Sequence, residues 1–300
     1  MKNSNQRVLK TTSIGVIASE ILSTDQDAQV FGRTSKGIFI KTSGKWLIFL
    51  SFEEFRGPLT ITFDKIDPIL GLVSAGDPIQ IASQSIFIPA LDVTIPIAGG
   101  KIWQPPLPAA PALGELERHR QLAECAREIL SNKNGEGLGS LIPPVLGFPD
   151  AHPAHKTIAN FDWAYLQQLQ NYIRNREAAP LARQLAAILG SGPGLTPSAD
   201  DFTVGLLLSL NRWQNLLWTA DDLRDLNLAV VEAAYEKTTT LSANLIECAT
   251  LGLADERLIN ALDWIVTGIA REPKIVTHLL DWGNSSGVDA FTGMAVALTA

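Results

Sequence analysis

A glycine-rich segment followed by two adjacent acids is the part of this sequence best suited to chemistry. Residues 190–202 read Gly-Ser-Gly-Pro-Gly-Leu-Thr-Pro-Ser-Ala-Asp-Asp-Phe, and an apolar run that includes Gly205 follows. Glycine permits backbone conformations and close ligand approaches that other residues resist. A glycine-rich loop leading into a helix gathers unpaired backbone N–H groups, which favour an anionic ligand. The segment therefore predicts a loop and a helix start that hold a small anion.

A second segment repeats part of this pattern. Ser-x-x-Asp-x-x-x-Gly occurs at residues 198–205 and again at 286–293, each time before an apolar helix. Helix capping is the simpler explanation, since Ser at the N-cap with an acid three residues later is a variant of the capping box. Pro197 also suits a first helical position, which would make Thr196 the cap. Capping explains neither the alternating glycines nor Asp200, so we favour two helix starts that frame one polar pocket.

Each residue type has a role in this interpretation. Backbone N–H groups and hydroxyls hold phosphate or carboxylate oxygens, and Asp side chains accept N–H groups from an amide or carbamoyl group. A third wall comes from the hydroxyl cluster at 238–242, because residues i and i+4 share a helix face. The predicted catalytic residues are Asp200, Asp201 and Asp289. The predicted substrate-binding residues are Gly192, Gly194, Thr196, Ser198, Thr238, Ser242, Ser285, Ser286 and Gly287.

The acids create an electrostatic tension, because carboxylates repel the anion that a helix N-terminus attracts. They point elsewhere, or serve the nitrogen end of the ligand, or hold a cation. Mg²⁺ is the cation left open, since it binds one or two carboxylates together with waters and phosphate oxygens. No other cofactor is expected. Arg212 and Lys237 are the basic residues nearest in sequence, and neither lies in a motif. A dianionic phosphate would need an arginine, and a partner subunit is one source.

Histidine and cysteine give weaker signals. His152 and His155 follow Asp150 but lack further spaced ligands, so no metal site is predicted. Four scattered histidines also give no Ser-His-Asp ordering. Cys125 and Cys248 form no CxxC pair, and free thiols are favoured over a disulfide.

Composition bounds the class of protein. The chain has 300 residues, of which 46% are hydrophobic and 18% charged, enough for two domains with large cores. A formal net charge of −7 argues against nucleic acid or an anionic membrane as the main partner. The N-terminus lacks an apolar signal-peptide core and no stretch reaches the length of a membrane span, so a cytoplasmic location is expected.

The pattern along the chain predicts an α+β, two-domain fold. Short, regularly spaced strands over residues 1–100 predict a small antiparallel barrel or sandwich, and the prolines of 101–112 predict a linker. Beyond it, residues 113–300 show helical periodicity, with a broken segment at 132–160 and an interruption at the three threonines 238–240. The expected strands are 37–41, 45–50, 59–63, 79–81 and 86–88. The expected helices are 113–130, 161–176, 179–189, 202–217, 221–251, 254–270, 273–282 and 287–298.

The helical region resembles a bacterial family, catalogued as a domain of unknown function, that includes the AllH-type subunit of oxamate carbamoyltransferase. The resemblance rests on Gly-x-Gly-Leu-Thr-Pro-Ser-x-Asp-Asp at 192–201 and on Ser-Ser-Gly-x-Asp-x-x-x-Gly at 285–293. Ala199 stands where the family usually has glycine. The resemblance implies a link to an enzyme of anaerobic allantoin breakdown, a part of purine catabolism. That enzyme moves a carbamoyl group from oxalurate to phosphate, giving oxamate and carbamoyl phosphate, in an assembly of different subunits.

Three hypotheses follow for function. The first is a carbamoyltransferase subunit that binds a small carbamoyl, carboxylate or phosphate compound at the paired helix starts. The second is a non-catalytic partner or metabolite-sensing subunit, whose motifs bind a ligand or another chain. The third is purely structural, with glycines and caps that let two buried helices cross closely.

Overall fold

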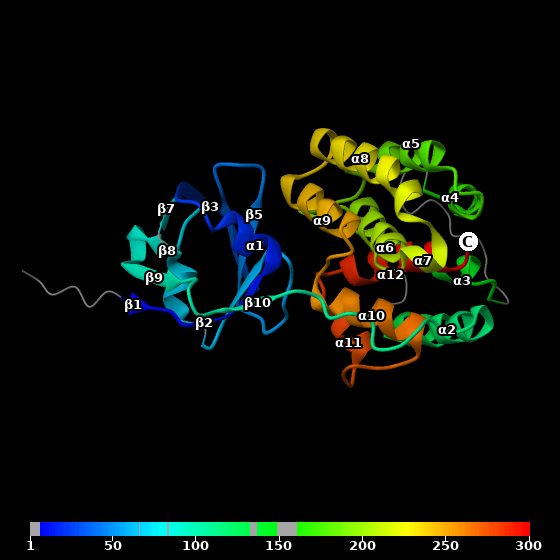
Figure 1. Cartoon of the computed structure of the whole chain (residues 1–300), viewed down its shortest axis with the longest axis horizontal. Helices are drawn as coiled ribbons and strands as arrows, with labels where there is room; N and C mark the ends of the chain where they lie inside the picture. The colour runs from blue at the N-terminus through cyan, green and yellow to red at the C-terminus, as the bar shows by residue number, and fades with distance from the viewer. Residues whose placement is uncertain (1–6, 66, 83, 133–136, 149–160) are drawn as a thin grey trace, which may run out of the picture. The chain divides into compact units, whose positions relative to one another are not determined.

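The computed structural model describes residues 7–65, 67–82, 84–132, 137–148 and 161–300. The chain divides into two compact units, Met1–Pro105 and Pro106–Ala300. The first is built of strands and the second of helices (Figure 1), which confirms the α+β class with the β part first. Within the described residues no helix is long and apolar enough to cross a membrane.

The N-terminal unit is one ten-stranded sheet in the order β1-β9-β8-β7-β3-β4-β5-β6-β2-β10. Most neighbours are antiparallel, as expected, but β1 with β9, β10 with β2 and β5 with β6 are parallel. Branched aliphatic side chains such as Ile38, Ile40, Ile86 and Ile95 form its core. The strands are β1 (Arg7–Val8), β2 (Thr11–Gly15), β3 (Gln26–Thr34), β4 (Gly37–Lys41), β5 (Leu47–Ser51), β6 (Thr60–Phe63), β7 (Pro78–Ala82), β8 (Ser85–Ile88), β9 (Val93–Pro96) and β10 (Lys101–Trp103), with the short helices α1 (Val16–Ile21), η1 (Pro68–Leu72) and η2 (Pro89–Leu91).

The predicted linker 101–112 is wrong at its start. Lys101, Ile102 and Trp103 form β10 and pair in parallel with Ser13, Ile14 and Gly15 of β2. Isolated three-residue strands carry little pattern of their own, so the prolines beyond Trp103 dominated the sequence signal.

The C-terminal unit consists of helices around one apolar core. The long element expected at 221–251 is two helices that meet at Thr238 and Thr239, so the predicted interruption is confirmed. The segment predicted as one helix over 202–217 begins earlier and breaks at Trp213. The elements are α2 (Glu115–Asn132), η3 (Gly139–Leu141), α3 (Ile142–Val145), α4 (Trp163–Arg174), α5 (Ala178–Ile188), α6 (Ser198–Arg212), α7 (Gln214–Leu217), α8 (Ala220–Lys237), α9 (Thr240–Thr250), α10 (Glu256–Thr267), α11 (Ile275–Leu280) and α12 (Ser286–Leu298).

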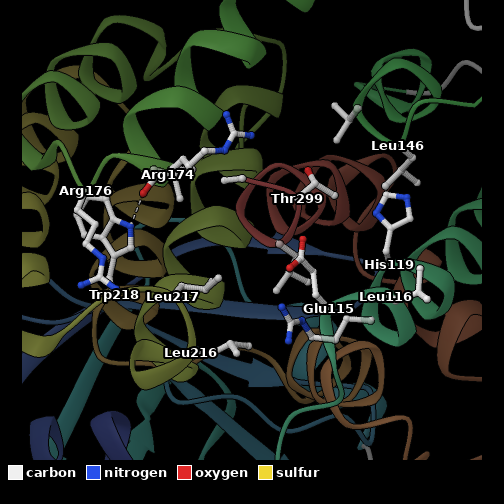
Figure 2. Close-up of a pocket in the computed structure, with 15 residues that line it drawn as sticks. Glu115, Leu116, His119, Leu146, Arg174, Arg176, Leu216, Leu217, Trp218 and Thr299 are labelled. Carbon is white, nitrogen blue, oxygen red and sulfur yellow. Dashed lines mark hydrogen bonds between the residues drawn. The ribbon is translucent and has the colours of Figure 1, made fainter.

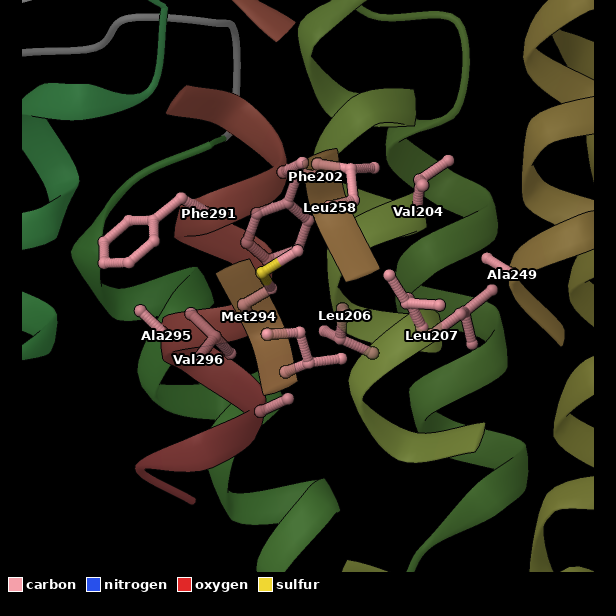
Figure 3. Packing of buried hydrophobic residues seen from close by; sticks show 14 of the residues in the cluster. Phe202, Val204, Leu206, Leu207, Ala249, Leu258, Phe291, Met294, Ala295 and Val296 are labelled. Carbon is pink, nitrogen blue, oxygen red and sulfur yellow. The ribbon is translucent and has the colours of Figure 1, made fainter. Parts of the chain in front are cut away.

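Helices α6 and α12 form the centre of this unit. Every residue of α6 from Ser198 to Leu210 is buried, and so is every residue of α12 from Ser286 to Ala297. Figure 3 shows Phe202 of α6 beside Met294 of α12. Helices that are apolar on all faces need neighbours on all sides, and the surrounding helices supply them.

Two glycines let α6 and α12 approach in a reciprocal way. A Cβ atom built on Gly205 would lie 1.9 Å from the carbonyl oxygen of Ala290, and one built on Gly293 would lie 2.0 Å from that of Phe202. Phe202 and Ala290 occupy equivalent places in the repeated pattern, each directly after its Asp. The two helices are therefore related by an approximate two-fold symmetry, with each glycine against the backbone of the other helix.

The glycine contacts give the first prediction. Alanine is the better helix former by about 1 kcal/mol, so Gly→Ala would ordinarily stabilise a helix. Here the added methyl group has no room, and we expect Gly205→Ala or Gly293→Ala to lower the free energy of unfolding by roughly 1–3 kcal/mol or more, as over-packing does. Urea denaturation measures the change. Gly44→Ala, where a Cβ meets nothing within 4 Å, is the control; variants as stable as that control would contradict the close approach.

Candidate functional site

The loop before α6 depends on three glycines with left-handed backbones. Gly190, Gly192 and Gly194 have φ of +78°, +120° and +97°. A Cβ on Gly190 would lie 2.5 Å from the Lys237 carbonyl oxygen, and one on Gly192 would lie 2.7 Å from the Ser198 nitrogen. The first two glycines are thus required for the folding of the loop on itself and on α8, whereas Gly194 faces open space and is exposed.

The N-terminus of α6 is not capped by a side chain. The helix begins at Ser198, Pro197 stands at the N-cap, and neither Thr196 nor Ser198 caps it. The Ala199 N–H donates to the Ser191 carbonyl at 3.1 Å, and the N–H groups of Asp200 and Asp201 donate to that of Pro197. The glycine loop itself therefore satisfies the first turn.

Helix α12 begins in the same way, at Ser286 and with no side-chain cap. Its Gly287 N–H donates to the Trp282 carbonyl at 3.0 Å, and a Cβ on Gly287 would lie 2.0 Å from the Leu279 carbonyl oxygen. Gly287 therefore packs closely against Leu279, and its contact with substrate stays a prediction. The capping-box interpretation is wrong for both helices.

Asp200 ties three segments together. It is fully buried, its Oδ1 accepts the Gly190 N–H at 2.8 Å, and its Oδ2 accepts the Thr238 hydroxyl. Burial raises the pKa of Asp200, opposed by these two hydrogen bonds and by the nearby Ser242 hydroxyl. Asp200 therefore fixes the glycine loop to the junction of α8 and α9.

The adjacent Thr239 strengthens the same junction. Its hydroxyl donates to the Leu195 carbonyl at 2.7 Å and accepts the Ser242 N–H at 3.1 Å, which caps α9. The hydroxyl cluster thus does form a wall beside the glycine loop. The Ser242 hydroxyl is buried and has no hydrogen bond of normal geometry within the described residues.

Asp289 is held by backbone that the sequence did not identify. Its Oδ1 accepts the Leu138 N–H at 2.6 Å, and its Oδ2 accepts the Ser285 hydroxyl at 3.0 Å. A Cβ on Gly137 would lie 2.1 Å from Oδ1, so only glycine fits there. Burial raises the pKa of Asp289 to about 6, opposed by hydrogen bonding from Leu138 and by the Ser198 and Ser285 hydroxyls.

Asp201 differs from both neighbouring acids. It is 1% exposed, and neither carboxylate oxygen has a hydrogen bond of normal geometry within the described residues. Burial raises its pKa well above the usual range; the nearby Ser286 and Thr196 hydroxyls lower it, and the charges of Asp289 and Asp200 raise it further. A buried carboxyl group without partners carries a large desolvation cost when ionised. Burial therefore favours the protonated form of Asp201, and the ionised form would need a ligand as hydrogen-bond donor.

The serines extend the two-fold relation into the site. Ser286 of α12 lies near Asp201 of α6, and Ser198 of α6 lies near Asp289 of α12. The hydroxyls of Thr196 and Ser286 are 3.3 Å apart, which places the end of the glycine loop against the start of α12. The structure thus brings together Thr196, Ser198, Asp201, Ser286 and Asp289. The two helix starts frame one polar centre.

Basic side chains are already engaged elsewhere. Arg212 forms a buried bidentate pair with Asp263 at 2.7 and 2.6 Å and also donates to the Pro106 carbonyl. Lys237 donates to the Ala186 carbonyl at 3.0 Å. Neither residue that the sequence offered as a nearby cation is therefore placed to neutralise a phosphate at this centre.

Metal and thiol chemistry receive no support from the described part of the chain. It contains no group of three His, Cys, Asp or Glu side chains that could hold a metal ion. Asp150, His152 and His155 lie outside the described residues. Cys125 and Cys248 are buried free thiols with raised pKa values caused by burial, so the two form no disulfide.

Comparison with known proteins shows that the segment carrying the motifs is similar to one family. Residues 188–298 match the family model described as oxamate carbamoyltransferase subunit AllH. Over this segment the chain is similar to the AllH family. The matched range contains both repeated motifs and the hydroxyl cluster, which confirms the resemblance seen in the sequence. No curated protein and no solved structure matches the chain. The AllH description points to a subunit associated with oxamate carbamoyltransferase.

The raised pKa of Asp289 gives the second prediction. A folded-state pKa above the unfolded one means that protonation stabilises the fold, and this contribution is lost as the pH rises through about 6. We expect wild-type stability, relative to Asp289→Asn, to fall by roughly 1–3 kcal/mol as the pH rises from about 4 to 7. Urea midpoints across this range measure it. Asp225→Asn, an exposed site on α8, is the control; a difference between wild type and Asp289→Asn that does not vary with pH would contradict the assignment.

Proposed function

We propose that this chain is a subunit of a carbamoyltransferase of the oxamate type, and that it binds a small carbamoyl or carboxylate compound where α6 and α12 begin. The observation that carries the proposal is Asp201, a buried carboxyl group near Thr196 and Ser286 that has no hydrogen bond of normal geometry within the described residues. Evolution rarely leaves a buried polar group unsatisfied without a functional reason. A bound ligand would supply the missing partners.

The chemistry of the site suits an amide-bearing ligand better than a bare phosphate. The N–H groups of Ala199, Asp200 and Asp201 already donate to the carbonyls of Ser191 and Pro197. Arg212 and Lys237 are engaged elsewhere. Carboxylates accept N–H groups, and hydroxyls donate to carbonyl or carboxylate oxygens. We therefore propose that the nitrogen of the carbamoyl group or of oxamate donates to Asp201 and Asp289. The oxygens of the ligand would accept hydrogen bonds from the hydroxyls of Thr196, Ser198 and Ser286. Gly194, exposed at the loop, would border the entrance.

The raised pKa values suit proton transfer during carbamoyl transfer. In the proposed reaction a phosphate oxygen attacks the carbamoyl carbon of oxalurate, the bond from that carbon to nitrogen breaks, and the departing nitrogen takes a proton. A protonated Asp201 would give that proton, because burial raises its pKa and favours the protonated form. Positioning of the two reactants contributes the remainder. The negative charge of the phosphate would be neutralised by a basic residue of another subunit or by Mg²⁺. Mg²⁺ is the cofactor that the acidic residues would allow.

A second candidate function is a non-catalytic partner or metabolite-sensing subunit. The observation that favours it is the lack of an unengaged Arg or Lys among the described residues of the motifs, because phosphoryl chemistry ordinarily uses such a cation. In that case Asp201 accepts a hydrogen bond from a regulatory metabolite, and other chains perform the transfer. The family description names a subunit, which supports further protein partners under either candidate.

The third prediction tests ligand binding at Asp201. We expect phosphate, carbamoyl phosphate, oxamate or oxalurate, alone or in pairs and with or without Mg²⁺, to raise the melting temperature of the full chain. A ligand that binds only the folded state stabilises it by mass action. The shift should disappear in Asp201→Asn and persist in Asp225→Asn.

Turnover separates the two candidates. Conversion of carbamoyl phosphate and oxamate to oxalurate by the isolated chain, lost in Asp201→Asn, supports a catalytic subunit. A ligand-induced shift without turnover supports the sensing subunit. A shift that Asp201→Asn retains in full would overturn the assignment of the site, whichever candidate applies.

A further inference from the structure

A pocket of the helical unit lies at the far end of α12 from the motifs. Its volume is about 720 Å³, and Leu298 and Thr299, at the end of α12, line it. The helix has 13 residues, so with a rise of about 1.5 Å per residue this end lies roughly 20 Å from Ser286. Figure 2 shows Arg174 and Arg176 on one side of the pocket, with His119 and Leu116 on the other.

Three arginines face this one space. Arg118 comes from α2, Arg174 from the last turn of α4, and Arg176 from the turn that follows; Glu115 is the acidic side chain among the lining residues. Among the lining side chains positive charge therefore exceeds negative charge, although the whole chain carries a formal charge of −7. Guanidinium groups are the usual ligands for carboxylate and phosphate.

The arginines have few charged partners within the described residues; Arg174 and Arg176 are exposed, and Arg118 is partly buried. Arg118 and Arg174 form no ion pair within the described residues, and the buried Nε of Arg118 has no hydrogen-bond partner there. Arg118 donates to the backbone carbonyl of Leu113, and Arg174 donates to the side-chain amide oxygen of Asn171. Both acceptors are uncharged. Arg176 lies 3.9 Å from Asp222, a surface pair that contributes little stability.

The backbone at Arg176 has a conformation that is unusual for a residue with a side chain. Its φ is +57°, directly after the end of α4, where its N–H and that of Glu177 donate to the carbonyls of Ile173 and Tyr172. Helices that end in this way usually have glycine at that position, because a side chain there is strained. Glycine suits this backbone better than arginine, so a change to glycine can remove the side chain without straining the turn.

Much of the remaining lining is aliphatic, although His119 and Thr299 are polar. Val145, Leu146, Leu216 and Leu217 contribute aliphatic surface next to the guanidinium groups. A volume of this size is typical of sites for small organic ligands. A ligand that fits has anionic groups for the arginines and a less polar portion for the aliphatic wall.

We propose that this pocket binds an organic anion with two or more phosphate or carboxylate groups, held by Arg118, Arg174 and Arg176. This site is separate from the polar centre at Asp201. Binding here does not depend on the proposed carbamoyl transfer. Phosphate and carboxylate share the chemistry that arginine recognises, so the experiment distinguishes them.

The fourth prediction tests this site by titration calorimetry on the full chain with pyrophosphate, ATP without metal, and citrate. We expect saturable binding of at least one probe that weakens as salt is added. Arg174→Gln and Arg176→Gly should each weaken it by roughly tenfold, as loss of a charge-assisted contact does. Arg176→Gly should also leave the protein at least as stable as wild type, because glycine suits the left-handed backbone. This variant separates lost binding from lost folding.

Arg120→Gln is the matched control, since Arg120 is exposed on α2 and does not line the pocket. Binding of pyrophosphate or ATP alone would assign a phosphate ligand, and binding of citrate alone a polycarboxylate. Absence of binding with all three probes would overturn the proposal. Binding that Arg174→Gln and Arg176→Gly leave unchanged would overturn it as well. The Asp201→Asn variant should bind as the wild type does, so failure here and failure of the proposed function are distinguishable.

Discussion

The close approach of α6 and α12 is the constraint on which the helical unit depends. Each helix places a glycine against the backbone carbonyl of the other, at 1.9 and 2.0 Å from where a Cβ would lie. Such contact brings two N-terminal turns together and buries everything on them, the acids included. The same geometry that makes a dense core therefore creates a polar centre inside it, and the approximate two-fold symmetry supplies that centre with a Ser and an Asp from each helix.

The three acids of this centre are buried equally and used differently. Asp200 and Asp289 each accept hydrogen bonds from backbone and hydroxyl groups, which is how folded proteins usually accommodate a buried carboxylate. Asp201 has no such support, although it is the symmetric counterpart of Asp289. Leu138 accounts for the difference, because its N–H donates to Asp289. The described residues provide no equivalent backbone donor for Asp201. We interpret that asymmetry as the place where a ligand completes the structure.

Sequence patterns predicted the chemistry-bearing residues better than the contacts between them. The spacing of Ser, Asp and Gly at 198–205 and 286–293 was sufficient to pair two helix starts, because residues at equal spacing on two helices take equal positions. It could not show that Gly287 serves packing or that Asp200 is structural, since both depend on backbone from distant segments. Leu138 was missed because its contribution is a backbone N–H, which no side-chain pattern reveals. Strand β3 was missed for another reason: in its nine residues only Val30 is buried, so it has almost no apolar alternation.

The central claim is that a ligand completes the hydrogen bonding of Asp201, and carboxyl-region infrared difference spectroscopy tests it most directly. Spectra of the full chain would be recorded with and without oxamate and carbamoyl phosphate, for the wild type and for Asp201→Asn. The account predicts a ligand-induced change in a protonated-carboxyl band that the variant lacks. A wild-type spectrum without any carboxyl change on ligand binding, or the same change in Asp201→Asn, would contradict it.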